Sequence, residues 1–341
     1  MRDEGPHLAE WIAHHLAAGV DHFLIFSDRC TDGTDLMLDE LAGVGIVTHV
    51  RLGPGEGPDA ARPVQWRALK AAATHPRYRA AGWVLVSDCD EFINLHGPLA
   101  DLRDLIASLP RGSDALAMRW RLFGSAGRVA PGAGMTIERF TRAAPEDIAL
   151  PLAHFMKALF RPAAFRAPGV HRPRARGGRL SRWVDGSGRP LPESFARSDG
   201  RINLWGIGAG CDLVQLNHYA LRSADEFMAK RRRGLPNHTA RPVDLGYWTE
   251  RNFNQVEDTG IARMIPATRA RMTALLEIGR LAELQEAALT RHRAELARQL
   301  GDSGENRLYL QLALAAGSTP PAPEFMRHHL ARLAAAEHRN G

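Results

Sequence analysis

An apolar run that ends in closely spaced acids constrains this chain more than any other feature. Residues 83–86 are Trp, Val, Leu and Val, and the acids Asp88, Asp90 and Glu91 follow them. Such a run predicts a buried central strand of a parallel sheet that meets a loop. Open α/β sheets bind their ligands at the carboxyl ends of such strands. Asp88 and Asp90 can both turn toward a hard divalent cation bound to phosphates, and without a cation their charges would repel each other. A solvated turn after the strand is the alternative that this run leaves open.

Predicted helices and strands alternate through the first part of the chain. Helices are predicted at residues 8–18, 36–41, 64–73 and 99–109, and strands at residues 23–26, 46–50, 83–86 and 115–120. This alternation indicates an α/β fold with a parallel sheet. From residue 123 to about 210 many Gly, Pro and Arg residues loosen the pattern, and irregular insertions of this kind often form substrate surfaces.

The last third of the chain changes character. A short strand at residues 214–219 contains His218, and a helix follows it at residues 224–233. From about residue 266 the sequence is helical and rich in Ala, Leu and Arg, so we expect two or three accessory helices there. The sequence therefore predicts a main α/β unit at residues 1–265 and a helical tail at residues 266–341.

Composition and targeting signals narrow the class of protein. The 341 residues can hold one large α/β domain with an appendage, and 45% of them are hydrophobic, an ordinary share for a soluble globular protein. No run of 18 apolar residues predicts a membrane span, and the first residues lack the apolar core of a secretory signal. The three cysteines lie far apart, which fits a reducing cytosol and argues against a structural zinc site. We expect a cytoplasmic protein that can contact the inner face of the membrane through its tail.

The net charge of +6 is a weak guide to partners, because only three of the 44 basic residues are lysines and the arginine bias resembles that of a GC-rich coding sequence. Two local clusters remain, at residues 161–182 and 230–233. Arginine forks suit phosphate oxygens, whereas most charge runs are solvated faces. The clusters lack interleaved aromatic residues and a helix-turn-helix pattern, so no nucleic-acid partner is expected.

Several segments in order resemble one enzyme family. The matching segments are residues 2–6, 10–11, 19–22, Asp28 with residues 31–34, residues 65–66, 88–92 and 217–219, Phe227 with Lys230, and residues 254–258. Together they resemble glycosyltransferase family 2-like proteins, in particular a bacterial subgroup that shares features with family 92. The resemblance implies the GT-A fold, a Rossmann-like sheet that is mixed but mainly parallel, with flanking helices. It also implies a nucleotide-sugar donor, a divalent metal (Mn²⁺ or Mg²⁺) and a glycan or glycolipid acceptor such as a polysaccharide.

The resemblance also suggests roles for individual residues. Asp28 matches the acid that contacts the nucleobase, and Glu4 lies in the segment beside that pocket. Asp88 and Asp90 match the DxD motif, in which the second acid holds the metal and the first faces the ribose or a metal-bound water. His218 matches a late histidine that serves as a further metal ligand, although a lone histidine after a strand is more often structural.

Basic residues can stabilise the leaving diphosphate. The candidates are Lys157, Lys230 and Arg231, and the segment at residues 225–260 is predicted to be a mobile lid that excludes water. Resemblance to family 2 implies inversion, which needs a general base to take the acceptor proton.

The general base itself has no matching motif. His171 is the candidate on the acceptor side, with a loop histidine bonded to the backbone as the alternative. The residues at 123–127 resemble the loop that lines the acceptor. Four further acids lie in the right interval without a matching motif: Glu138, Asp185, Glu193 and Asp199.

The first residues depart from the family pattern. Family members have an apolar strand just before the segment that matches residues 1–4, and here the chain begins where that strand should finish. We expect a misassigned or trimmed start; otherwise the sheet would lack a central strand. That departure leaves open a catalytically inactive nucleotide-sugar binder or scaffold of the same fold. A nucleotidyltransferase would also need acids for a metal, but the glycine-rich stretch at residues 53–57 lies in the wrong place for its phosphate loop.

Overall fold

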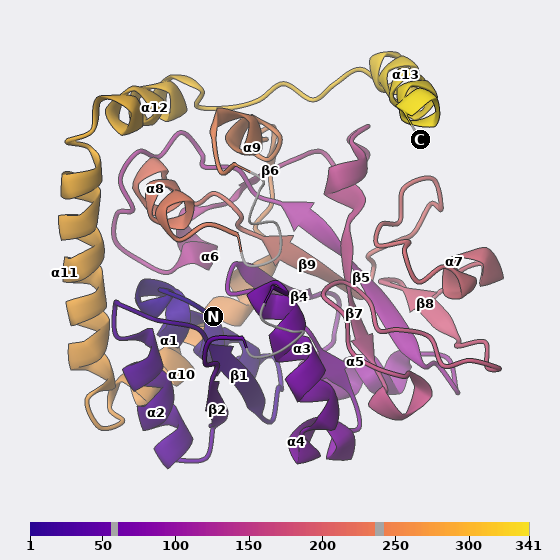
Figure 1. Cartoon of the computed structure of the whole chain (residues 1–341). Helices are drawn as coiled ribbons and strands as arrows, with labels where there is room; N and C mark the ends of the chain where they lie inside the picture. The colour runs from indigo at the N-terminus through magenta and orange to yellow at the C-terminus, as the bar shows by residue number, and fades with distance from the viewer. Residues whose placement is uncertain (56–60, 236–241, 341) are drawn as a thin grey trace.

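The computed structural model describes residues 1–55, 61–235 and 242–340. It is an α/β structure whose largest sheet is mixed and curled (Figure 1). The strands of this sheet follow the order β3 (Val84–Leu85), β7 (Met156–Phe160), β5 (Ala115–Leu122), β9 (Val214–His218) and β4 (Glu91–Leu95), and β8 (Trp183–Asp185) also pairs with β5.

The prediction of a mainly parallel sheet is wrong. β5 runs parallel to β8 and β9, but β3–β7, β5–β7 and β4–β9 are antiparallel pairs. The apolar run at residues 83–86 supplies only the two-residue β3, at the end of the strand order rather than its centre. The prediction failed because an apolar run reports burial on both faces, whereas strand direction depends on how distant segments connect.

Two smaller sheets complete the strands of the described chain. β1 (Phe23–Ser27) and β2 (Val47–Arg51) form a parallel pair, and β6 (Arg142–Ala143) pairs antiparallel with β10 (Val256–Glu257). The first residue lies beside β1, because the Asp28 amide donates to the Met1 carbonyl at 2.9 Å and the Met1 ammonium donates to the Phe26 carbonyl. Residues 1–4 therefore follow the strand edge that leads to Asp28.

Helices cover the sheets and extend into the tail. The shorter ones are α2 (Thr34–Gly43), α3 (Val64–Thr74), α4 (Pro76–Ala80), α5 (Leu102–Ser108), α6 (Thr136–Arg139), α7 (Glu193–Arg197), α8 (Ala224–Arg233) and α9 (Leu245–Thr249). α1 (Gly5–Ala17) packs on β4: the Trp11 indole donates to the Glu91 carbonyl at 3.0 Å, and the His14 ring bonds the Ile93 carbonyl at 2.7 Å. Local chemistry sets several boundaries, such as Ser223, which forms a capping box at the start of α8.

Within the described residues four helices follow residue 264, where two or three were predicted. They are α10 (Ile265–Leu276), α11 (Leu281–Gln299), α12 (Ser303–Leu314) and α13 (Pro323–Asn340). Leu275, Leu281 and Leu284 lie in the main hydrophobic core, so α10 and α11 share that core with the preceding unit. Figure 1 shows α11 running along one side of the molecule toward α12, with α13 at a distance across the top. Over the described residues, none of the helices is both long and apolar enough to cross a membrane.

Candidate active site

Strand register places four chemically important side chains on one face of the sheet. His218 of β9 lies opposite Glu91 of β4 and opposite Leu122 of β5. Lys157 of β7 lies opposite Met118 of β5. Since side chains alternate along a strand, Trp120, Lys157, Glu91 and His218 all point to the same face. A one-residue shift in the pairing of any of these strands would move its side chains to the opposite face of the sheet. The register therefore creates the cluster.

The turn between β3 and β4 brings the two aspartates to this face. The Lys157 ammonium nitrogen lies 2.8 Å from one Asp88 carboxylate oxygen, and that of Lys230 lies 2.8 Å from one Asp90 oxygen. The side chain of Asp88 is 39% exposed, whereas that of Asp90 is 11% exposed. The structure therefore brings Asp88, Asp90, Lys157 and Lys230 together, as two separate ion pairs.

The lysines keep both aspartates ionised. Burial alone would raise the pKa of each carboxyl group. For Asp88 the Lys157 ammonium outweighs burial and lowers its pKa. For Asp90 the Lys230 ammonium and the adjacent His218 ring outweigh burial more strongly, and the pKa of Asp90 falls well below the ordinary range. Both carboxylates can thus stay charged in one site, because each has a lysine that offsets their mutual repulsion.

Glu91 follows the two aspartates in the sequence, but the sequence pattern gave it no role. Its fully buried carboxylate accepts hydrogen bonds from the Trp120 indole at 2.8 Å and the Asp88 amide at 2.9 Å, and it lies 3.4 Å from the Lys157 ammonium. Burial raises the pKa of Glu91 above its ordinary value, against the opposing charge of Lys157. Glu91 thus holds the turn that carries Asp88, and it contacts Lys157 on the buried side.

Trp120 lies between the two predicted histidines. Its ring centroid is 4.1 Å from that of His218 and 5.4 Å from that of His171. His171 bonds the Met156 carbonyl through Nδ1 at 3.0 Å, which fits a proton on that nitrogen and a lone pair on Nε2. Burial and then the Lys157 charge lower the pKa of His171 to about 4, so the ring is neutral at pH 7. His171 therefore belongs to the same site and also makes the backbone bond of the structural alternative.

Asp90 and His218 could supply two of the ligands of a divalent cation, but not a complete set. Asp90 Oδ1 and His218 Nε2 lie 3.7 Å apart, beyond hydrogen-bond distance, and burial lowers the pKa of His218, which favours the neutral ring that a metal needs. His218 Nδ1 is buried without a hydrogen-bond partner. An octahedral cation with bonds of about 2.1 Å would need these donors about 3 Å apart, so a small approach would suffice. No group of three such side chains converges within the described residues, so a cation would need phosphate oxygens and water to complete its shell.

The two acids predicted for the nucleobase side of the site form ion pairs with arginines. Asp28 is buried and pairs with Arg29 at 3.1 Å, with Arg2 4.0 Å away. Glu4 is also buried, and one of its carboxylate oxygens lies 2.7 Å from Arg233 while the other has no hydrogen-bond partner. Both acids lie along the loops that leave Met1 and β1, as the resemblance implies.

Arg231 is placed differently from the other predicted basic residues. Its guanidinium makes a forked ion pair with Glu305 of α12, with the shortest contact at 2.7 Å, and donates to the Val243 carbonyl at 2.8 Å. The structure therefore gives no support to a direct contact between Arg231 and a diphosphate, because the guanidinium is already bonded at the tail.

The four further acids in the interval of the general base make hydrogen bonds or ion pairs away from the charged cluster. Glu138 bonds the Met135 amide, Asp185 the amides of residues 187 and 189, Glu193 the Arg197 side chain and Asp199 the Ala175 amide. The loop at residues 123–127 is held by a second segment, since the Ser125 and Ala126 amides donate to the side chains of Asn252 and Asn254 at 2.8 Å.

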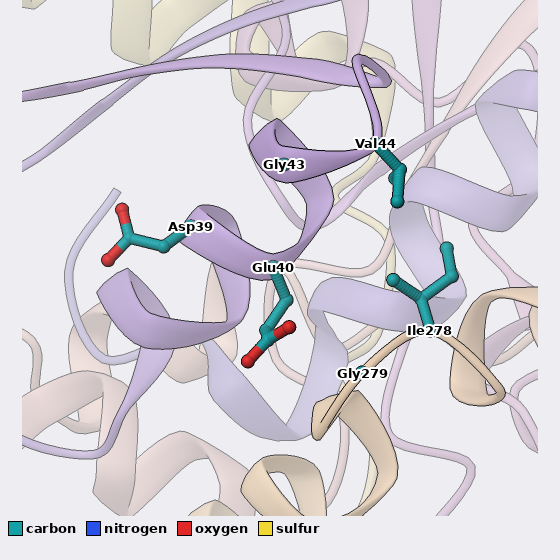
Figure 2. Close-up of a pocket in the computed structure, with 6 residues that line it drawn as sticks. All are labelled: Asp39, Glu40, Gly43, Val44, Ile278 and Gly279. Atoms are coloured by element: carbon teal, nitrogen blue, oxygen red, sulfur yellow. The ribbon is translucent and has the colours of Figure 1, made fainter.

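An open depression of the described surface lies away from these residues. It has a volume of about 380 Å³. Figure 2 shows the residues that line it: Asp39, Glu40, Gly43 and Val44 at the end of α2, and Ile278 and Gly279 before α11. None of the residues of the charged cluster lines it, so the candidate site rests on the charged cluster and not on a pocket.

Comparison with known proteins identifies a family. The family model for glycosyltransferase family 92 matches residues 4–180, a range that includes Asp28, both aspartates of the turn, Lys157 and His171, but not His218 or Lys230. A comparison with curated proteins gives no match. The family match extends over more than half of the chain. The chain therefore belongs to glycosyltransferase family 92.

Proposed function

We propose that this glycosyltransferase moves a sugar from a nucleotide-diphosphate donor to a glycan or glycolipid acceptor, with inversion, on a GT-A fold. One observation carries the proposal: two aspartates lie on one sheet face, each 2.8 Å from a lysine ammonium, with His218 and His171 on either side of Trp120. A diphosphate leaving group needs positive charge around its oxygens, and Lys157 and Lys230 are the cations nearest the acids.

The second part of the proposal concerns a divalent cation, Mn²⁺ or Mg²⁺. Asp90 and His218 would hold it, and a bound cation would supply charge stabilisation for the diphosphate. Lys230, whose ammonium donates to Asp90 and to the Ala220 carbonyl at 2.8 Å each, would contact the phosphates while it stays beside Asp90. Lys157 would stay with Asp88 and Glu91, because it is fully buried between them.

A catalytically inactive nucleotide-sugar binder is the second candidate. The observation that favours it is that each aspartate is already neutralised by a lysine, which leaves less charge to attract a metal. The two candidates differ in the chemical step alone, so a binding experiment tests the site and a turnover experiment separates them.

Thermal unfolding with nucleotides tests the donor site. UDP, GDP, CDP and dTDP are added with and without Mn²⁺ to the wild type and to His218→Ala. We expect one nucleotide to stabilise the wild type in the presence of Mn²⁺, by about 2.7 kcal/mol at a hundredfold excess over its dissociation constant. His218→Ala should lose most of the metal-dependent part. An absence of stabilisation by all four nucleotides would refute the donor site; equal stabilisation without Mn²⁺ would refute the metal alone.

His171→Asn tests the acceptor side. An asparagine amide can still donate to the Met156 carbonyl, so the substitution removes mainly the Nε2 lone pair. If His171 takes the acceptor proton, kcat should fall by about 10²- to 10⁴-fold while nucleotide affinity stays the same. Release of nucleoside diphosphate from the sugar nucleotide measures kcat, and isothermal titration measures affinity. An unchanged kcat would show that His171 is only a structural loop residue.

A further inference from the structure

Four successive basic residues end α8, and each contacts a different acid. The pairs are Lys230 with Asp90 at 2.8 Å, Arg231 with Glu305 at 2.7 Å, Arg232 with Glu295 at 3.6 Å and Arg233 with Glu4 at 2.7 Å. Since successive helical residues point about 100° apart, the four cations leave the helix in different directions. Two of the acids lie at the proposed donor site, and the other two lie on α11 and α12 of the tail.

Apolar contacts hold the same helix against the tail. Phe227 and Met228 of α8 are fully buried, and they share a hydrophobic cluster with Leu308 and Leu312 of α12. The Tyr309 hydroxyl donates to Asp225 at 2.6 Å, one turn before the basic residues. α8 is therefore fixed from the tail side along its length, and Figure 1 shows it between α12 and the strands of the site.

Of these four ion pairs, the one between Arg231 and Glu305 has a forked geometry with several hydrogen bonds. Arg231 reaches both Glu305 oxygens with three bonds of 2.7–3.0 Å, and Gln299 of α11 donates to the same carboxylate at 2.7 Å. A forked arginine–carboxylate pair fixes direction as well as distance. It therefore fixes the rotation of α8 about its axis, and this rotation decides where the preceding residue, Lys230, points.

We infer that the tail helices α11 and α12 complete the donor site from outside, by holding α8 so that Lys230 stays at Asp90. Glu305 is then a positioning residue for the diphosphate, acting through Arg231, and the tail is a working part of the enzyme. This inference rests on the proposed function, since it concerns the same diphosphate site. It also accounts for Arg231, which belongs to the basic run but faces the tail.

Pyrophosphate binding in the presence of Mn²⁺ tests the inference without knowledge of the nucleotide. Isothermal titration is carried out on the wild type, Glu305→Ala and the control Glu283→Ala. The control breaks a forked pair with Arg280 near the start of α11, whose side chains are 64–65% exposed. We expect Glu305→Ala to bind pyrophosphate about fivefold more weakly or worse, the low end of coupling between separate sites, and the control to match the wild type.

A charge exchange separates positioning from a general loss of folding. Arg231→Glu combined with Glu305→Arg restores attraction between α8 and α12 with the charges reversed. Positioning predicts that pyrophosphate affinity returns most of the way to the wild-type value. Weak binding by the exchanged pair would overturn the inference, because it would mean that the Arg231 charge itself is needed. Equal binding by Glu305→Ala and the wild type would overturn it too, while the proposed function would stand. An absence of pyrophosphate binding by the wild type would refute both.

Discussion

Lys157→Met is expected to destabilise the protein by about 3–5 kcal/mol, the usual cost of breaking a buried ion pair from one side. Lys157 is fully buried, and it lies between the fully buried Glu91 and the partly exposed Asp88. Methionine fills a similar volume but leaves the Asp88 charge without this partner, and above pH 8, where Glu91 ionises, it leaves the Glu91 charge without one too. Urea unfolding of both proteins at pH 9 measures the difference, with Arg271→Met on the exposed surface of α10 as the control, expected within about 0.5 kcal/mol of the wild type.

The loss should depend on pH in a defined direction. Burial already raises the pKa of Glu91 to about 8 in the presence of Lys157, and without that lysine it should rise further. A group whose pKa is higher in the folded than in the unfolded state stabilises folding fully below its unfolded pKa, about 4.3, and loses that contribution as pH rises through its folded pKa. The deficit of Lys157→Met should therefore be smaller at pH 6, where Glu91 is protonated in both proteins, than at pH 9, where the wild type alone gains a Glu91–Lys157 ion pair. An equal deficit at both pH values would mean that Glu91 does not carry the charge that Lys157 neutralises.

Sequence reasoning found the charged residues of the site better than it found their surroundings. Asp88 and Asp90 stand out because closely spaced acids after an apolar run are a local pattern. His171 and His218 came from the resemblance, and Lys157 from the need for positive charge at a leaving diphosphate. The structure places all three near the acids. Glu91 and Trp120 were not assigned roles, because their contact depends on β4, β9 and β5 pairing in one register. A single sequence does not show the register of strands that are more than a hundred residues apart.

The errors about the fold have the same origin. The helices of the first part and the tail were predicted because helical periodicity is contained within one segment. The direction of β7 against β5 was not, since it depends on the long irregular connection at residues 123–155. Arg231 shows the same limit at the level of one side chain: the basic run is visible in the sequence, but its division between donor site and tail depends on how α8 packs.

Asp90→Asn is expected to lower sugar transfer by about 10²- to 10³-fold, the usual cost of losing one electrostatic contact to a developing charge. The substitution preserves shape and keeps one oxygen for His218, so it removes charge with little change in packing. Asp90 holds Lys230 and faces His218, and its side chain is the more buried of the two aspartates. The measurement is release of nucleoside diphosphate from the sugar nucleotide whose base the thermal panel identifies, with Asp21→Asn, a surface pair with Arg103, as the control.

The comparison with Asp88→Asn makes this prediction specific to the site. Lys157 keeps Glu91 as a second partner when the Asp88 charge is lost. Among the described residues, the other hydrogen bond of Lys230 goes to the neutral Ala220 carbonyl, so loss of the Asp90 charge affects Lys230 more. Asp88 is also the more exposed acid, so water can replace part of its role. We therefore expect Asp88→Asn to reduce transfer less than Asp90→Asn does. Equal losses would mean that the two acids act as one unit on a shared ligand, and an active Asp90→Asn enzyme would remove this face of the sheet from the chemistry altogether.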